Sequence, residues 1–298
     1  MSQAQSLHRR IRSVKNAKQI TKAMEVVAAS RMRRVAAAAA NTQAYANLAK
    51  SILARIALSE EARAHKFFQP SEGGNTLYVI FTSDRGLAGA YNANIFSTAL
   101  ETFTIDQEAS NRPSVIAFGQ KGARFFARFD GINLVGEYEK VDDVPPANVF
   151  APVLEAINHG LSSASFTKVK IIYTRFSSAM SQTVQTSQLL PVAIAAEDET
   201  RTEIPAKLYE FEPLTEEVIE EALRLYLEAQ LMQAKVDSAA SEYAMRMVAM
   251  GSANRNASEL IDDLTLELNA SRQAAITAEI AEITGGANAI SSMEGRTL

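Results

Sequence analysis

Residues 218–250 read VIEEALRLYLEAQLMQAKVDSAASEYAMRMVAM, and this stretch decides the fold. Small and apolar side chains recur in it at alternating spacings of four and three residues, which is the repeat of a coiled coil. The repeat positions are Val218, Ala222, Leu225, Ala229, Met232, Val236, Ala239, Tyr243, Arg246 and Met250, and Ala253, Ala257, Leu260 and Leu264 continue them. The pattern predicts one long helix with a narrow stripe for a partner helix.

The N-terminal segment carries a matching stripe. Its repeat positions are Val14, Ala17, Thr21, Met24, Ala28, Arg31, Val35 and Ala38. Most of these side chains are small, so two helix backbones can approach each other closely along the stripe. The two ends of the chain are therefore expected to form a long two-helix coiled coil.

The prolines separate these two helices from the middle of the chain. All eight prolines lie between Pro70 and Pro213, so the first 69 and the last 85 residues have none. A helix over residues 214–284 would be about 105 Å long at ~1.5 Å per residue. A compact chain of this length would measure only about 50 Å across. We therefore expect the helix pair to project from the rest as a rod.

The middle of the chain predicts an α/β domain. Short β-rich runs occur at residues 76–82, 114–118, 132–136 and 168–174, with plausible helices near 91–109, 119–128 and 147–163. This alternation favours a small, mainly parallel, Rossmann-like sheet with helices on its faces. An edge strand is expected at 182–192 and an acidic linker at 193–213. The predicted parts are an N-terminal coiled-coil helix at 1–69, a central α/β domain with its linker at 70–213, and a C-terminal coiled-coil helix at 214–298.

The composition excludes several kinds of chemistry. The chain has no cysteine, which rules out disulfides, thiolate metal sites and thiol catalysis. Its three histidines, His8, His65 and His159, are far apart in sequence and leave little for a zinc or iron site. The carboxylates of residues 259–282 are interpreted as a solvated helix face. No apolar run approaches the ~20 residues that span a bilayer, and no signal-peptide core is present, so an unprocessed, soluble, intracellular chain is expected.

Charge is unevenly distributed along the chain. Residues 1–34 hold nine lysines and arginines against one acid, whereas residues 255–298 hold seven acids against three arginines. Residues 197–221 hold ten acids against two bases. This asymmetry predicts either an acidic partner for the N-terminal helix or ends that lie beside each other. Nucleic-acid binding is an alternative, although no aromatic residue precedes Tyr45 to stack on bases.

One turn motif, TSDRGLAGAYN at residues 82–92, follows a predicted strand and opens a helix, which is where phosphate-binding loops occur. The spacing of Gly86 and Gly89 fits neither of the common phosphate-binding fingerprints. A structural turn, with Asp84 and Arg85 as local turn or capping partners, is therefore the favoured interpretation. A nucleotide-binding enzyme with helical arms is the alternative, and measurable nucleotide affinity would support it.

Three blocks of the sequence resemble the gamma subunits of F-type ATP synthases. They are RRIRSVKNAKQITKAMEVVAASRMRR at 9–34, TSDRGLAGAYNANI at 82–95 and AASEYAMRMVAMGSANRNASELIDDLTLELNASRQAAITAEIAEITGGANAI at 239–290. The resemblance implies an antiparallel coiled coil of the two terminal helices inside a ring of alternating alpha and beta subunits. It also implies a central domain that lies beside the epsilon subunit and on the ring of c subunits.

The function implied by this resemblance is mechanical. The chain would be the rotating central stalk, which couples proton-driven rotation of the c ring to conformational cycling of the catalytic beta subunits. It would be non-catalytic, without cofactor or metal, in a complex with three alpha and three beta subunits. It would lie peripherally at the cytoplasmic face of an energy-transducing membrane, the bacterial inner membrane, without spanning that membrane or binding nucleic acid.

The resemblance also assigns contact residues. Positions that match the family's contacts with the alpha and beta ring are Lys22, Met24, Arg272, Gln273, Thr277 and Glu279. Positions that resemble the foot on the polar loops of the c ring are Tyr209, Phe211 and Glu212.

The sequence departs from the family pattern in three ways. Arg31 stands where lysine is common, and ITGGANAI at 283–290 is richer in glycine than usual, which predicts a less regular helix tip. The cysteine-bearing insertion of chloroplast forms is absent, which excludes thiol control.

Overall fold

The computed structural model describes residues 3–57, 59, 62, 64–65, 67–69, 75–108, 113–192 and 215–294. The chain divides into two compact units. The terminal unit comprises residues 1–26 and 248–298, and the sheet unit comprises residues 27–247. Two long helices, α1 (Gln3–Ile56) and α7 (Thr215–Glu294), contribute residues to both units.

The sheet unit is built on a five-stranded sheet in the order β3-β2-β1-β4-β5. Its strands are β1 (Thr76–Phe81), β2 (Ser114–Phe118), β3 (Asn133–Tyr138), β4 (Lys168–Phe176) and β5 (Gln182–Leu190). The first four strands pair in parallel, and β5 pairs antiparallel to β4 at the edge. The predicted small, mainly parallel sheet with an added edge strand is confirmed.

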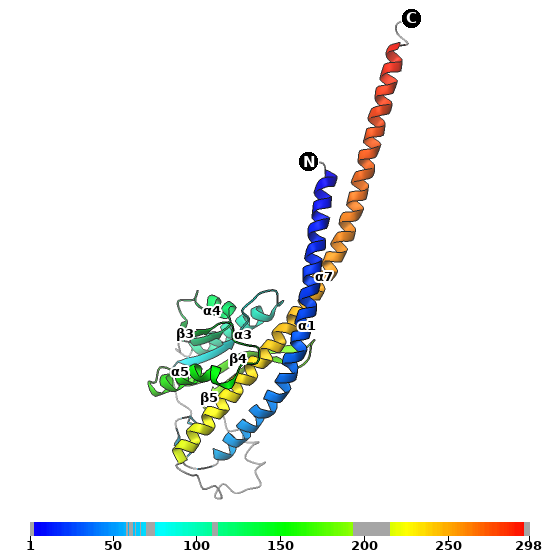
Figure 1. Ribbon diagram of the computed structural model, residues 1–298. Coiled ribbons are helices and arrows are strands. Elements are labelled where there is room, and N and C mark those ends of the chain that lie inside the picture. Colours follow the sequence, from blue (N-terminus) through cyan, green and yellow to red (C-terminus); the bar gives the residue numbers. More distant parts are fainter. Residues whose placement is uncertain are drawn as a thin grey trace. The chain divides into compact units, whose positions relative to one another are not determined.

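Helices cover both faces of this sheet (Figure 1). They are α3 (Tyr91–Glu108), α4 (Gln120–Phe126) and, after a 3₁₀ turn η1 (Ala147–Phe150), α5 (Ala151–Ser162). Alternate residues of β1 point to opposite faces. Leu77 and Val79 pack with α5 and α7, whereas Tyr78 and Ile80 pack with α3 and α4. Every residue of β1 and β2 is buried, as expected for strands covered on both sides.

Within the sheet unit, α1 and α7 pack against each other through small side chains. Val35 and Ala39 of α1 pack on Val236, Ala239 and Ala240 of α7. Ala46 and Ala49 pack on Ala229. Higher residue numbers on α1 meet lower numbers on α7, so the two helices are antiparallel. The predicted coiled pair with a small-residue stripe is confirmed in this unit.

The terminal unit holds a second stretch of antiparallel helix pair. Leu7 and Ile11 of α1 form a buried cluster with Leu264 of α7. Nearer the other end of the unit, the amide of Asn254 donates to the carbonyl of Lys18 at 3.4 Å. Here too the residue numbers run in opposite directions along the two helices.

The structure corrects the stripe predicted for α1. The predicted positions Val14, Thr21, Met24, Ala28 and Val35 are buried or half-buried, but others do not fit. Ala17 is exposed, and Ala39 rather than Ala38 is the buried residue after Val35. The cause is composition, because alanine occurs on every side of this helix and two phases of the repeat look almost equally good.

The tip of α7 is also more regular than predicted. The helix continues through Gly285 and Gly286 to Glu294, because two glycines cost only about 1 kcal/mol each in a helix. In the part of the chain that the structure describes, no helix has the length and apolar character needed to cross a membrane.

Candidate functional site

The turn after β1 is held by its own polar side chains. The backbone N–H of Ser83 donates to the side-chain oxygen of Asn92 at 3.1 Å, and the Asn92 amide donates to Ser83 Oγ at 2.7 Å. The Asp84 carboxylate accepts the backbone N–H of Gln120 at 3.0 Å and that of Lys140 at 3.1 Å. Asp84 therefore caps the start of α4 and fixes the loop after β3, so it is a capping residue as predicted, but for segments distant in sequence rather than for its own turn.

Close backbone packing seats this turn on α4. Thr82 Oγ1 donates to the carbonyl of Phe118 at 2.8 Å and accepts the N–H of Gly122 at 2.9 Å. A Cβ on Gly119, which has a φ of 94°, would lie 2.3 Å from the Thr82 carbonyl oxygen. A Cβ on Gly122 would lie 2.6 Å from Thr82 Oγ1. Only glycine permits this close approach of the turn to α4.

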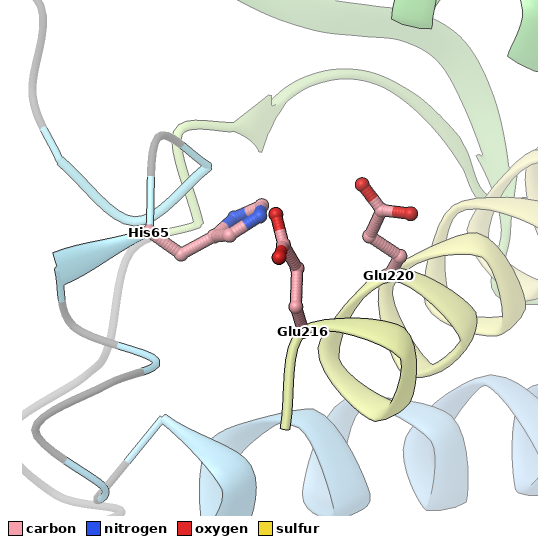
Figure 2. A group of neighbouring side chains, drawn as sticks. All are labelled: His65, Glu216 and Glu220. Carbon is pink, nitrogen blue, oxygen red and sulfur yellow. The ribbon is translucent and has the colours of Figure 1, made fainter. Parts of the chain in front are cut away.

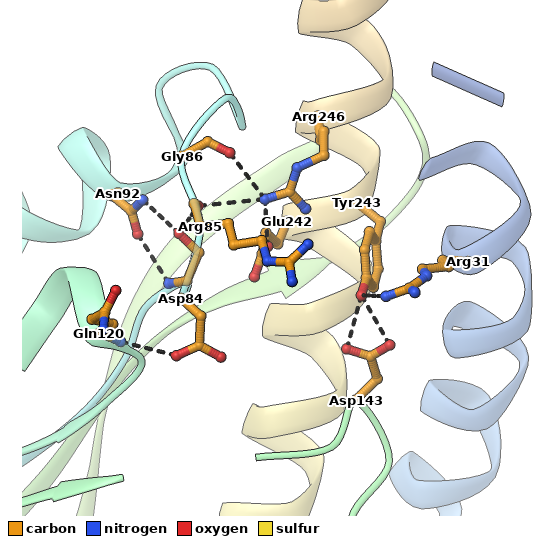
Figure 3. A network of polar contacts seen from close by, with 11 residues as sticks. Arg31, Asp84, Arg85, Gly86, Asn92, Gln120, Asp143, Glu242, Tyr243 and Arg246 are labelled. Carbon is orange, nitrogen blue, oxygen red and sulfur yellow. Dashed lines mark hydrogen bonds and ion pairs between the residues drawn. The ribbon is translucent and has the colours of Figure 1, made fainter. Parts of the chain in front are cut away.

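Arg246 of α7 connects this turn to the long helix (Figure 3). Its guanidinium donates to the carbonyls of Arg85 and Gly86 at 3.4 and 3.3 Å. It also forms an ion pair with Glu242 at 2.7 Å, one helical turn earlier. Arg246 was predicted to lie in the stripe between the two helices. That prediction is wrong, because the side chain is buried against the turn of the sheet domain.

Helix α7 lies at the point of the sheet where nucleotide-binding folds hold their ligand. In open α/β sheets that point is the crevice beyond the strand ends where the strand order reverses, here between β1 and β4. Ser241 of α7 donates to the carbonyl of Thr174 in β4 at 3.1 Å, and Arg246 reaches the turn after β1. The geometry therefore favours the structural interpretation of the turn.

Tyr243 joins three parts of the sheet unit (Figure 3). Its hydroxyl donates to the carboxylate of Asp143, in the loop after β3, with O–O distances of 3.0 and 3.1 Å. The same hydroxyl accepts a hydrogen bond from Arg31 of α1 at 3.0 Å. Arg34 of α1 lies 3.8 Å from Asp143, and Arg246 packs over the Tyr243 ring at 5.6 Å. One side chain of α7 thus contacts both α1 and the sheet domain.

Burial perturbs the ionisable groups of α7 around this junction. Burial raises the pKa of Glu242, and the charge of Arg246 opposes that rise. Burial also lowers the pKa of Lys235 and raises the pKa of Asp237 to about 6. The pKa of Tyr243 is raised mainly by burial, so its hydroxyl stays protonated and able to donate.

Six of the residues predicted from sequence to contact a ring belong to the terminal unit, whereas this junction belongs to the sheet unit. Lys22 is exposed and pairs with Glu25 at 3.1 Å, and Met24 is half-buried. Arg272, Gln273, Thr277 and Glu279 are all exposed on the end of α7. Tyr209, Phe211 and Glu212 lie outside the described residues.

The end of α7 presents apolar side chains as well as these polar ones. Every residue from 272 to 286 is exposed, including Ile276, Ile280 and Ile283, whose exposed fractions are 47%, 56% and 66%. Because the spacings are four and three residues, the isoleucines share one side of the helix. Such a stripe on an exposed helix is typical of a surface that packs on another protein.

Sequence reasoning missed the junction formed by Tyr243, Asp143 and Arg246. The repeat pattern predicts Tyr243 and Arg246 as ordinary stripe positions, and no pattern in the sequence points to Asp143. One clue was present, because arginine at a position that should face a partner helix needs a carboxylate or carbonyls nearby. Arg31 and Arg246 both occupy such positions. Arg31 donates a hydrogen bond to the Tyr243 hydroxyl, and Arg246 pairs with the Glu242 carboxylate.

Comparison with known proteins gives the family. The family model described as ATP synthase matches residues 3–290. The ATP synthase gamma chain of Desulforamulus reducens is 36% identical over 290 residues, covering 97% of this chain and all of that protein. The gamma chain of Chloroflexus aurantiacus is 37% identical over 295 residues, with 98% and 100% covered.

Solved structures agree with that match. The central stalk and c-ring structure of the Tetrahymena thermophila mitochondrial ATP synthase includes a chain with a TM-score of 0.57 and 28% identity, covering 78% of this chain and 99% of that one. A chain of the Euglena gracilis mitochondrial ATP synthase gives a TM-score of 0.66 at 19% identity, with 99% and 96% covered, which supports the fold alone. With its antiparallel helix pair and central sheet, the chain belongs to the family of ATP synthase gamma chains.

Proposed function

We propose that this chain is the rotating central stalk of an F-type ATP synthase. It couples rotation of a ring of c subunits to the conformational cycle of catalytic beta subunits and performs no chemistry itself. The observation that carries the proposal is the junction at Tyr243 and Arg246, which fastens α7 to α1 and to the sheet domain. A torque applied to the domain would pass through these contacts into the helix pair.

The mechanism follows from asymmetry. A pair of helices has no threefold symmetry, so it cannot present the same face to three equivalent catalytic sites around it. Each site then experiences different contacts and takes a different conformation and nucleotide affinity. Turning the pair exchanges those states among the sites, which is linkage between the orientation of the stalk and ligand affinity.

Two surfaces are proposed to meet the surrounding subunits. Lys22 and Met24 face an acidic loop of the beta subunit, and the end of α7 contacts the ring through Arg272, Gln273, Thr277 and Glu279. The exposed guanidinium of Arg272 suits charge-assisted hydrogen bonds to carboxylates. Tyr209, Phe211 and Glu212 form the foot on the c ring. These contacts are divided among three parts of the chain. They are the N-terminal helix at 1–69, the central domain with its linker at 70–213, and the C-terminal helix at 214–298.

The proposed assembly contains three alpha and three beta subunits per chain, an epsilon subunit and the c ring. The chain lies at the cytoplasmic face of the bacterial inner membrane, attached through the c ring. The relatives from bacteria with gamma chains of nearly the same length support this location.

The test of this proposal is a double substitution, Arg272→Ala with Gln273→Ala, in the assembled complex. Both side chains are exposed within this chain, so the free energy of unfolding should change by less than about 0.5 kcal/mol. ATP turnover or torque should fall several-fold because the helix loses its polar contacts with the ring. Arg128→Ala, an exposed arginine of the sheet unit, is the matched control and should leave turnover unchanged.

Two outcomes would contradict different parts of the proposal, the contact residues and the stalk function. Unchanged turnover in the double variant would remove the assigned contact residues but leave the stalk function standing. Failure of the chain to co-purify with alpha and beta subunits in a 3:3:1 ratio would remove the stalk function itself.

A further inference from the structure

A histidine and two glutamates from distant parts of the sequence meet in the sheet unit (Figure 2). His65 lies in the segment between α1 and β1, and Glu216 and Glu220 lie one helical turn apart at the start of α7. One ligand atom from each side chain lies within 4.8 Å of the others. The imidazole and the Glu216 carboxylate point toward one another across the gap between the two segments.

Backbone contacts fix the position of His65. Its N–H donates to the carbonyl of Ala62 at 3.0 Å, and its own carbonyl accepts the N–H of Phe68 at 3.0 Å. Its ring packs on Phe67 with 4.9 Å between centroids, and Phe67 and Phe68 are buried in the main core cluster. The imidazole is therefore carried by an anchored segment.

The two glutamates are equally well supported. Ile219 and Leu223, which flank them on α7, are buried in the same core cluster as Phe67 and Phe68. Residues four apart on a helix lie on the same face, so the carboxylates of Glu216 and Glu220 can converge on one point. Two anchored segments thus supply the three side chains, of which the two glutamates are exposed.

Among the described residues, negative charge gathers beside this cluster. Glu155, Glu217 and Glu221 line a cleft of about 350 Å³ beside it, together with Glu220. Arg224, the cation of this cleft, forms its ion pairs with Glu221 and Glu228. Among the described residues, neither Glu216 nor Glu220 forms an ion pair. A bound dication would balance the charge of these carboxylates.

We infer that His65, Glu216 and Glu220 bind one divalent transition metal ion of the zinc class. An imidazole nitrogen combined with carboxylates suits zinc better than magnesium or calcium, which prefer oxygen ligands throughout. Bonds of ~2.1 Å place tetrahedral ligands about 3.4 Å apart. The exposed glutamate side chains therefore need to move by only about 1–2 Å to close the site, and water completes the coordination.

The ion would tie the segment that precedes the sheet to the helix that follows it. Its role is structural, because it joins two segments that are distant in the sequence. The inference stands independently of the proposed function and can be tested on the isolated chain.

The experiment is titration of the full-length, chelator-treated chain with zinc chloride by calorimetry. We expect one zinc ion per chain, with affinity at least about tenfold weaker in His65→Ala and in Glu216→Gln. Matched controls are His159→Ala, an exposed histidine on α5, and Glu217→Gln, the neighbouring carboxylate on α7. Both control variants should bind like the original chain.

A second measurement guards against variants that fail to fold. Zinc at saturating concentration should raise the melting temperature of the original chain and of both controls, but not that of His65→Ala. The inference is overturned by the absence of saturable binding or by equal binding in His65→Ala. Equal weakening by His159→Ala would also overturn it, since the ion would then be adventitious.

Discussion

Helix α7 passes through two very different environments. Between Tyr226 and Arg246 most of its side chains are buried, because one side meets α1 and another meets the sheet domain. Between residues 272 and 286 every side chain is exposed. Both stretches are rich in alanine and in polar residues, so composition does not distinguish them. The comparison teaches that the first stretch is anchored by contacts within this chain, whereas the second depends on helix propensity and on partners.

The largest effect is expected from Arg246→Ala in the anchored stretch. The change leaves the Glu242 carboxylate and the carbonyls of Arg85 and Gly86 buried without their cation. Breaking such a pair costs about 3 kcal/mol of unfolding free energy, which urea denaturation would measure. Arg255→Ala, on an exposed part of the same helix, should cost less than about 0.5 kcal/mol. Equal losses of unfolding free energy in the two variants would mean that the anchored stretch is no better held than the exposed part of the helix.

Asp237→Asn should have the next largest effect, and it depends on pH. Burial raises the pKa of this carboxyl to about 6, although Gln233 and Arg175 oppose the rise. The folded chain therefore holds this proton more tightly than the unfolded chain, and stability falls as pH rises from about 4 to 6. At pH 7.5 the asparagine variant should be more stable, by on the order of 2 kcal/mol, with no difference near pH 4.

A matched change in an exposed carboxylate gives the control for this pH dependence. Asp263→Asn should leave stability unchanged at both pH values, because Asp263 is exposed on α7. Denaturation curves at pH 4 and 7.5 for the three proteins make the comparison. A gain for the Asp237 variant that is the same at both pH values would contradict the role of burial.

Tyr243→Phe is expected to have a moderate effect. It removes the hydroxyl that connects Asp143 with Arg31 but keeps the ring in the core. The expected loss is about 1–1.5 kcal/mol, because water can reach the two partners that remain. A double-mutant cycle with Asp143→Asn should show a coupling energy of at least about 0.5 kcal/mol. Strict additivity would mean that the hydroxyl does not connect the helix to the loop.

The smallest effect on global stability is expected at the exposed end. A Cβ at Gly285 or Gly286 would meet nothing within 4 Å. Replacing both with alanine should stabilise the helix locally by up to about 1 kcal/mol per residue and slow amide exchange there. The melting temperature of the sheet unit should not move, because that unit contains neither residue. A clear rise would show that the exposed end and the anchored stretch are coupled.

The sheet domain was predictable because its signals are local. Continuous apolar runs such as residues 114–118 mark buried strands, and the observed β2 covers the same residues. Polar turns and prolines separate these runs from the helices. The run at 132–136 gave the right strand but the wrong end, since β3 extends to Tyr138.

The helix pair and the junction were harder to predict for physical reasons. In α1, alanine at 37, 38 and 39 leaves the phase of the repeat ambiguous, and only packing against Val236 selects Ala39. The contact between Tyr243 and Asp143 joins residues 100 positions apart, and no periodic pattern records it. The sequence indicated that Asp84 acts in a turn, but its partners, Gln120 and Lys140, are 36 and 56 positions away, and no local pattern points to them.

The unequal reach of the two helices has a mechanical consequence. In the terminal unit α1 begins at Gln3 and packs near Leu264, whereas α7 continues to Glu294 as a single helix. A lone helix twists more easily under a given load than two helices locked side by side. The last turns of α7 should therefore be the part of the terminal unit that twists most easily under torque. Uneven steps of rotation would be smoothed there.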